Sequence, residues 1–366
     1  SKAADGGCEE VPLSGRAPQV LPGDRPLNHR IRTDPRQESC MKTLYGAALC
    51  SAVMTLAAMP AAWAQGSGDK PISLIVPFSP GGGTDILSRM LAPKLAEKLG
   101  TSVVVENRPG AAGAIAAQSV ARAAPDGRTL LVGSTSEIGV NPSLYPKLPY
   151  DVARDFVPVA ALADTPMVLV VNPASPIKTA QELVTRAKAS PGQLLFASAG
   201  VGSGAHLAAE LFFHVTGTKL AHVPYKGVGP AMAEIVGAQK DMMIFTTLPS
   251  STSFAKSGQL RVVAVSSKER SPVMPDVPTF IESGVPGYEV YYWYGLLAPA
   301  ATPIDIRRRI HQAVSEVLKQ ADTLASLARQ GLQPTLRTAD EFDAFIKADI
   351  QRWAVVVKAA DIRPDQ

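Results

Sequence analysis

The sequence is poor in cysteine, and this excludes several kinds of chemistry at once. Its three cysteines, Cys8, Cys40 and Cys50, all precede residue 64, where we expect an export signal to be removed. The rest of the chain therefore has no disulfide, no zinc–thiolate site and no cysteine nucleophile.

The sequence also lacks an excess of charge of one sign. It has 36 Lys and Arg against 32 Asp and Glu, a net charge of +4. The basic residues are scattered among acidic ones, which argues against nucleic acid as a partner. The few histidines show no metal-ligand spacing such as His-Glu-x-x-His, and no paired carboxylates stand out. We therefore expect no metal, no cofactor and no catalytic residues.

Long apolar runs are absent too, apart from residues 44–62. That run follows Met41 and Lys42 and ends in the small-x-small box formed by Ala62, Trp63 and Ala64, which is typical of a secretory signal peptide over residues 41–64. It is short and alanine-rich for a membrane anchor. We expect a periplasmic protein. Residues 1–40 carry many prolines and arginines, and we interpret them as a misassigned start or untranslated upstream sequence without a fold. A real disordered extension is the alternative.

Beyond residue 65, short β-rich runs alternate with helical patterns, which predicts an α/β fold with a mainly parallel sheet. The pattern restarts at residue 167, and a further β-rich run covers residues 290–298. We expect two lobes, residues 65–165 with 289–366 and residues 166–288, joined by two crossover strands with a ligand cleft between them. Two long helices, residues 304–330 and 339–360, are predicted to end the chain.

A glycine-rich turn lies between the first predicted strand and helix. Its candidate ligand-binding residues are Phe78, Ser79, Gly82, Gly83, Thr84 and Asp85. Glycine lets the backbone approach a ligand, and the start of a helix offers free N–H groups to an anion. No Lys-Ser or Lys-Thr follows, so this is not a Walker loop. An ordinary tight turn with a helix cap is an equally good interpretation.

A second glycine-rich turn lies in the second predicted lobe. Its candidate residues are Ser198, Ala199, Gly200, Gly202 and Ser203. The spacing Gly200-x-Gly202-x-x-Ala205 matches a loose dinucleotide pattern, but no carboxylate ends the next strand, as such a site needs. The remaining interpretation of this turn is a second helix N-terminus that binds an anion. His206 follows this loop, either as a ligand contact or as an ordinary helix-start residue.

Other candidate contacts end predicted strands or lie on the returning run. They are Ser134, Thr135 and Ser136, Thr246 and Thr247, and Trp293. Hydroxyl groups at strand ends suit a cleft ligand, although turn chemistry explains Ser134 and Thr135 as well. Trp293 either forms a wall of the pocket or belongs to the core.

Six ordered motifs resemble the Bug family, the substrate-binding proteins of tripartite tricarboxylate transporters. They cover residues 71–85 (PISLIVPFSPGGGTD), 106–113 (ENRPGAAG), 125–131 (PDGRTLL), 198–206 (SAGVGSGAH), 223–227 (VPYKG) and 293–299 (WYGLLAP). The resemblance spans essentially residues 66–366. It implies a type II periplasmic-binding-protein fold in which the two glycine loops, residues 78–85 and 198–203, hold a carboxylate. The Phe78-Ser79 pair departs from what many members have.

The leading hypothesis is a monomeric, non-enzymatic solute receptor. It binds a dicarboxylate, acidic amino acid, citrate-like or aromatic acid and delivers it to membrane permease subunits. One alternative is an exported α/β enzyme that uses the second glycine loop for a dinucleotide. Another is a sensor that reports ligand to a membrane kinase.

Overall fold

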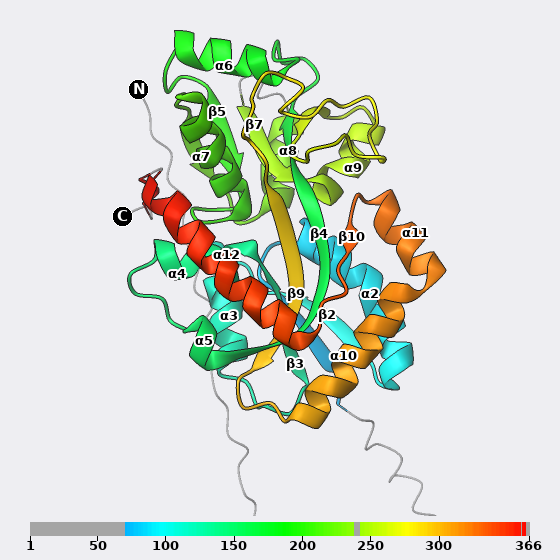
Figure 1. The fold of residues 1–366 in the computed structure, drawn as a ribbon. Coiled ribbons are helices and arrows are strands. Elements are labelled where there is room, and N and C mark those ends of the chain that lie inside the picture. The colour runs from blue at the N-terminus through cyan, green and yellow to red at the C-terminus, as the bar shows by residue number, and fades with distance from the viewer. Residues whose placement is uncertain (1–69, 238–241, 360, 364–366) are drawn as a thin grey trace, which may run out of the picture. The chain divides into compact units, whose positions relative to one another are not determined.

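The computed structural model describes residues 70–237, 242–359 and 361–363 (Figure 1). The expectations for residues 1–69, including the signal peptide, lie outside these described residues. Of the helices within the described ranges, none combines the length and the apolar character that a membrane crossing needs.

Strands and helices alternate along most of the chain, as the sequence predicts. The first half contains β1 (Ile72–Val76), α2 (Gly83–Leu99), β2 (Val103–Asn107), η1 (Ala111–Gly113), α3 (Ala114–Ala121), β3 (Thr129–Ser134), η2 (Thr135–Val140), α4 (Asn141–Leu144), α5 (Val152–Asp155), β4 (Phe156–Val171) and α6 (Ala180–Ala189). The second half contains β5 (Leu195–Ser198), α7 (Gly204–Thr216), β6 (Ala221–Pro224), α8 (Val228–Val236), β7 (Met242–Thr247), α9 (Leu248–Lys256), β8 (Arg261–Val265), β9 (Tyr291–Pro299), α10 (Ile304–Lys319), α11 (Ala321–Arg329), β10 (Gln333–Pro334) and α12 (Ala339–Ala359).

The strands form two sets, which we call the first and second lobes. In the first lobe, β1 lies between β2 and β3 in parallel, and β9 pairs with β3 in the antiparallel direction. In the second lobe, β5 lies between β6 and β7 in parallel. The predicted α/β class is therefore confirmed. The sheet in each half is mixed and not mainly parallel, because β4 and β9 pair with their neighbours in the antiparallel direction.

Two neighbouring strands connect the lobes. The 16-residue β4 pairs with β9 as far as Pro166 and with β7 from Met167 onward, so it changes sheet between these two residues. The chain passes back from the second lobe to the first at the start of β9. There, Val290 N–H donates to Ser266 O at 3.3 Å. Figure 1 shows β4 and β9 side by side along the molecule. Both are almost entirely buried, which explains their near-continuous apolar sequences.

Two predicted elements differ from the structure. The single helix expected over residues 304–330 is two helices, α10 and α11, because the backbone at Gln320 is extended (φ −66°, ψ 134°). The apolar period continues through this break, so the pattern could not reveal it. The crossover strand expected from residue 167 begins at Phe156, and Pro158 within it lies beside a register shift. Proline is tolerated at such irregularities, although in sequence it reads as a strand breaker.

Candidate functional site

A small cavity lies where the two lobes meet. Its volume is about 40 Å³, which is room for a few water molecules or a single carboxylate group. Its lining residues carry no charge, and they come from both lobes and from both crossover strands: Phe78, Gly82, Gly83, Thr84, Ser136, Met167, Ala199, Ser203, Gly204, Ala205, Val228, Thr246, Thr247, Tyr292 and Tyr294.

Four of the described helices begin at this cavity. Gly82 caps α2, Ser203 caps α7 and Thr247 caps α9, while Val228 is the first residue of α8. Each helix start has backbone N–H groups without intrahelical partners and the positive end of a macrodipole. The cavity therefore has a positive potential without a lysine, arginine or histidine in its lining.

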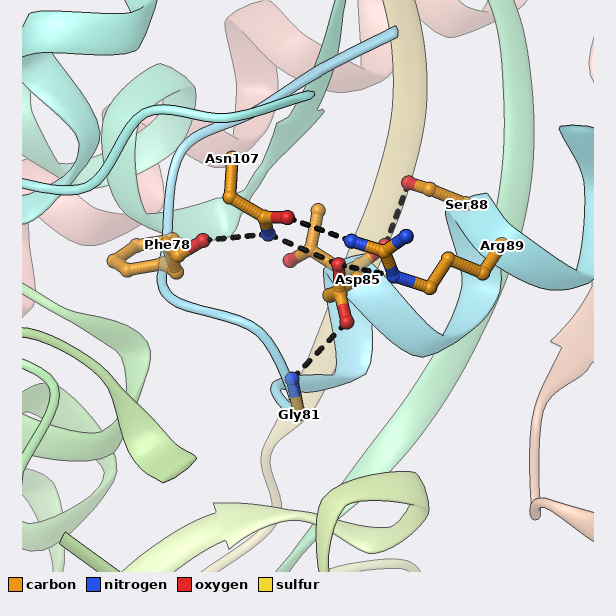
Figure 2. A network of polar contacts seen from close by, with 7 residues as sticks. Phe78, Gly81, Asp85, Ser88, Arg89 and Asn107 are labelled. Carbon is orange, nitrogen blue, oxygen red and sulfur yellow. Dashed lines mark hydrogen bonds and ion pairs between the residues drawn. The ribbon is translucent and has the colours of Figure 1, made fainter. Parts of the chain in front are cut away.

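The first glycine loop is fixed by a network behind the cavity (Figure 2). The buried Asp85 carboxylate accepts Gly81 N–H at 3.0 Å through Oδ2, and Arg89 Nε and Asn107 Nδ2 each donate to Oδ1 at 2.9 Å. Asn107 Nδ2 also donates to Phe78 O at 2.9 Å. Asp85 is thus fully engaged in shaping the loop and is absent from the cavity lining.

The second glycine loop is fixed by neutral side chains. Ser203 Oγ accepts His206 N–H at 3.3 Å, and His206 Nδ1 accepts Gly202 N–H at 3.2 Å. Burial lowers the pKa of His206 to about 3, with the neighbouring His222 acting in the same direction. The imidazole is therefore neutral, and it stacks on His222 with ring centroids 4.3 Å apart. His206 supports the loop and does not line the cavity.

Alternation along β9 decides which aromatic residues face the cavity. Tyr292 and Tyr294 line it, whereas Trp293 lies on the opposite face of the strand. The Trp293 Nε1–H donates to Asp349 Oδ2 at 2.7 Å, and its ring packs edge-on against Phe342. Successive side chains of a strand point to opposite faces. Trp293 is therefore a core residue, which is the second of the two roles that the sequence left open, and it is not among the residues that line this cavity.

Two buried hydroxyl groups of the cavity lining have no hydrogen-bond partner within the described part of the chain. They are Thr246 Oγ1 and Tyr294 OH, and both side chains are about 1% exposed. Burial raises the pKa of Tyr294, and a contact with Thr247 of β7 acts in the opposite direction. The hydrogen bond that Thr247 Oγ1 forms at 2.9 Å is with Ser250 Oγ. Unpaired buried polar groups are rare in native proteins, and each calls for an explanation. A polar ligand in the cavity provides one.

Direct contacts join the lobes around the cavity. Ser79 Oγ donates to Lys226 O and Tyr145 OH donates to Val201 O, both at 2.8 Å. Gly204 N–H, at the start of α7, donates to Ser136 Oγ of the first lobe at 2.7 Å. These bonds, together with the small cavity, describe a closed arrangement of the lobes.

The structure brings part of the predicted set together. Nine predicted residues line the cavity: Phe78, Gly82, Gly83, Thr84, Ser136, Ala199, Ser203, Thr246 and Thr247. The others lie beside or behind it: Ser79, Asp85, Ser134, Thr135, Ser198, Gly200, Gly202 and Trp293. Sequence reasoning missed Met167, Gly204, Ala205, Val228, Tyr292 and Tyr294. Strand alternation around Trp293 was the available signal for the two tyrosines.

Within the described residues, no group of three or more His, Cys, Asp or Glu side chains is placed to hold a metal ion. The cavity lining contains no carboxylate, which a ribose hydroxyl of a dinucleotide would require.

Comparisons with known proteins agree with this geometry. A family model described as "Tripartite tricarboxylate transporter family receptor" matches residues 87–362. Protein BugT of Bordetella pertussis is 40% identical over 290 residues, which cover 79% of this chain and 89% of BugT. An R. palustris protein solved with adipate is 34% identical and has a TM-score of 0.78. The match covers 81% of this chain and 98% of that protein. MatC from Rhodopseudomonas palustris, solved with bound malate, is 34% identical and has a TM-score of 0.75. The match covers 78% of this chain and 98% of MatC. The predicted type II periplasmic-binding-protein fold and the predicted family resemblance are thereby confirmed.

Proposed function

The chain belongs to the tripartite tricarboxylate transporter receptor family, a family of solute receptors, and on that premise we propose that it binds a small carboxylate between its lobes. The ligand class comprises dicarboxylates, acidic amino acids, citrate-like acids and aromatic acids. The adipate and malate in the two related structures favour the dicarboxylates among these.

The convergence of four helix N-termini on an uncharged cavity is the observation that supports this proposal most. Each charge–dipole contact stabilises an anion by about 0.3–1 kcal/mol when exposed and by up to about 2 kcal/mol when partly buried. Hydrogen bonds from Thr84, Ser136 and Tyr294 add to this. Together they suffice for micromolar affinity, about −8 kcal/mol. Phe78, Met167 and Val228 supply an apolar wall for a carbon skeleton.

Ligand entry requires the lobes to separate, because a cavity of about 40 Å³ is smaller than a six-carbon diacid. We place the hinge at Pro166–Met167 and Val290–Tyr291, where the two crossover strands change sheets. The lobes would then be residues 65–165 with 289–366 and residues 166–288. A ligand that contacts both lobes binds the closed state better than the open one, so it shifts the population toward closure.

The closed receptor would be the form that membrane permease subunits recognise. We propose a monomeric receptor, exported by the signal at residues 41–64, that delivers its ligand in the periplasm and performs no catalysis.

Titration calorimetry tests the binding proposal. The panel is adipate, malate, succinate, glutamate, citrate and benzoate, with adipamide as the uncharged counterpart of adipate and NAD as the dinucleotide. We expect at least one acid to bind with a micromolar Kd and adipamide not to bind. A folded protein that binds no acid on the panel, or that binds NAD more tightly than any acid, would contradict the proposal.

A further inference from the structure

A buried carboxyl group lies behind the cavity and has no role in the function proposed above. It belongs to Glu137 of η2, whose side chain is completely buried. Its Oε1 accepts Ser134 N–H, and its Oε2 accepts the Ser134 hydroxyl at 2.8 Å. Both partners are neutral, so no cation balances the carboxylate when it is ionised.

Hydroxyl groups connect Glu137 to the cavity and to the other lobe. Ser134 Oγ and Tyr292 OH are 2.7 Å apart, and Tyr292 OH and Ser136 Oγ are also 2.7 Å apart. Ser136 Oγ in turn accepts Gly204 N–H at 2.7 Å, at the start of α7. Ser136, Tyr292 and Gly204 all line the cavity. A ligand carboxylate at α7 therefore contacts one end of a hydrogen-bond chain whose other end is Glu137.

The direction of this chain depends on whether Glu137 carries a proton. When Glu137 is ionised, Ser134, Tyr292 and Ser136 each donate toward it, and the oxygen lone pairs face the cavity. When Glu137 is protonated, it donates to Ser134, each hydroxyl turns around, and Ser136 Oγ–H is free to donate into the cavity. A hydroxyl group can act as donor or acceptor, so the chain can run in either direction, and in the protonated form the Ser136 hydroxyl needs an acceptor in the cavity.

The surroundings of Glu137 favour the protonated form. Burial raises the pKa of Glu137 to about 8, while hydrogen bonds from Ser134 act in the opposite direction. Three tyrosines face it, Tyr150 through a bond from its hydroxyl to Glu137 O, and Tyr292 and Tyr294 from β9. Burial raises the pKa of each above its ordinary value, so they remain neutral.

Charged groups on the other neighbouring elements do not neutralise Glu137. From α12, Asp349 reaches η2 at Gly139, where an added Cβ would lie 2.6 Å from Asp349 Oδ2, and it pairs with Arg352. On α7, His206 is neutral. An ionised Glu137 would thus be an uncompensated negative charge close to a site for anions.

We propose that Glu137 is a proton-dependent positioning residue that acts through this hydroxyl chain. The cavity accepts a carboxylate only when Glu137 is protonated, so binding takes up one proton from solvent wherever Glu137 starts ionised. This inference rests on the proposed carboxylate binding. The proton removes the repulsion between two anions in a low-dielectric region and turns the hydroxyl chain toward the ligand.

Proton linkage fixes the sign of the pH dependence. The ligand raises the pKa of Glu137 above its value of about 8 in the free protein. Affinity is therefore full below about pH 8 and falls, by up to about tenfold per pH unit, as the pH rises above that value. Adipate is fully ionised over this range, so its own titration adds nothing.

Calorimetry with adipate at pH 6.5 and pH 9, in two buffers of different ionisation enthalpy, counts the protons taken up; malate replaces adipate if it binds more tightly. The wild-type protein should take up close to one proton per ligand at pH 9 and almost none at pH 6.5. Its affinity should be about tenfold weaker at pH 9.

Two variants assign the proton. Glu137→Gln should take up no proton, and its affinity should be the same at both pH values. Asp349→Asn is the matched control, since Asp349 is also a buried carboxylate against η2 but points to Trp293, away from the cavity. It should keep the wild-type proton count.

Each outcome decides the proposal. Adipate binding by the wild-type protein at both pH values without proton uptake would overturn the role of Glu137 and leave the receptor function intact. So would an unchanged proton count in Glu137→Gln. Absence of binding by any acid at either pH would overturn both proposals. If Glu137→Gln fails to fold, absence of proton uptake by the wild-type protein at pH 9 still overturns the proposal.

Discussion

The two glycine loops present the same backbone feature to the cavity, yet they are supported by different chemistry. The loop before α2 has no side-chain cap at Gly82 and is fixed by the Asp85 carboxylate, with the Arg89 guanidinium and the Asn107 amide bound to it (Figure 2). The loop before α7 has a serine cap and a buried neutral imidazole, His206.

This difference shows that an anion site built from backbone N–H groups leaves its supporting residues free to vary. The first loop depends on both partners of the ion pair between Asp85 and Arg89, because removing one partner leaves a buried charge unpaired. A neutral imidazole depends on remaining deprotonated. The two loops should therefore fail under different conditions, and the following experiments separate them.

The largest effect is expected from adding one methyl group at the first loop. In Gly83→Ala, the Cβ would overlap the Tyr294 hydroxyl and lie 2.6 Å from Thr247 Oγ1, so the lobes could not close. We expect at least about a 100-fold loss of carboxylate affinity by calorimetry. Gly82→Ala is the control, because the nearest atom to its Cβ is 3.8 Å away. Equal losses of carboxylate affinity in both variants would show that the absence of a side chain at Gly83 is not required for closure of the lobes.

An acid titration should separate the two supports. The folded protein lowers the pKa of His206 to about 3, so its contribution to stability is fully present above about pH 6.5 and is lost as the pH falls toward 3. Relative to His206→Asn, the wild-type free energy of unfolding should fall by up to about 1.4 kcal/mol per pH unit below pH 6.5.

The matching variant of the first loop is Asp85→Asn. It places an amide N–H₂ group against donors and should lower the free energy of unfolding by about 2 kcal/mol at neutral pH. Urea unfolding from pH 4 to pH 8 measures both variants. The comparison between the loops would be wrong if the wild-type protein lost no more stability than His206→Asn as the pH falls from 8 to 4.

A smaller effect should distinguish the two faces of β9. Tyr294→Phe removes a hydroxyl that has no partner among the described residues, so it should weaken carboxylate binding about three- to tenfold and leave stability nearly unchanged. Trp293→Phe removes the bond to Asp349 and should lower the free energy of unfolding by about 2 kcal/mol without affecting binding. Calorimetry and urea unfolding of both variants measure this contrast, and the reverse pattern would place the ligand on the other face of the strand.

The smallest effect is expected at the edge of the first loop. Ser79→Ala removes an exposed hydrogen bond between the lobes, to Lys226 O, and should weaken ligand binding about twofold. Ser119→Ala, which removes a bond within one helix to Ala116 O, should leave affinity unchanged. An effect above tenfold at Ser79 would mean that this residue contacts the ligand directly.

The sequence predicted the two glycine loops of the site more accurately than the side chains that line the cavity. Glycine runs after strands marked both helix starts, because glycine and helix-cap residues follow local rules of backbone geometry. The lining also needs Tyr292 and Tyr294, whose exposure to the cavity depends on the register of β9 against β3 and β4. The position of Asp85 in the first loop predicts a ligand contact, but its hydrogen bond with Asn107, 22 residues away, makes it a residue that supports the loop.

The sequence by itself determined the alternation of strands and helices, the two glycine-rich helix starts, and the absence of cysteine, paired carboxylates and metal-ligand spacing over most of the chain. These properties depend on neighbours along the chain. Tertiary structure alone decided that the starts of α2, α7, α8 and α9 meet at one cavity. It also decided that β4 changes sheet at Pro166 and that Glu137 is joined through Tyr292 to the opposite lobe. The physical reason is that burial and hydrogen-bond partners come from residues far apart in sequence, and no local pattern encodes which of them meet.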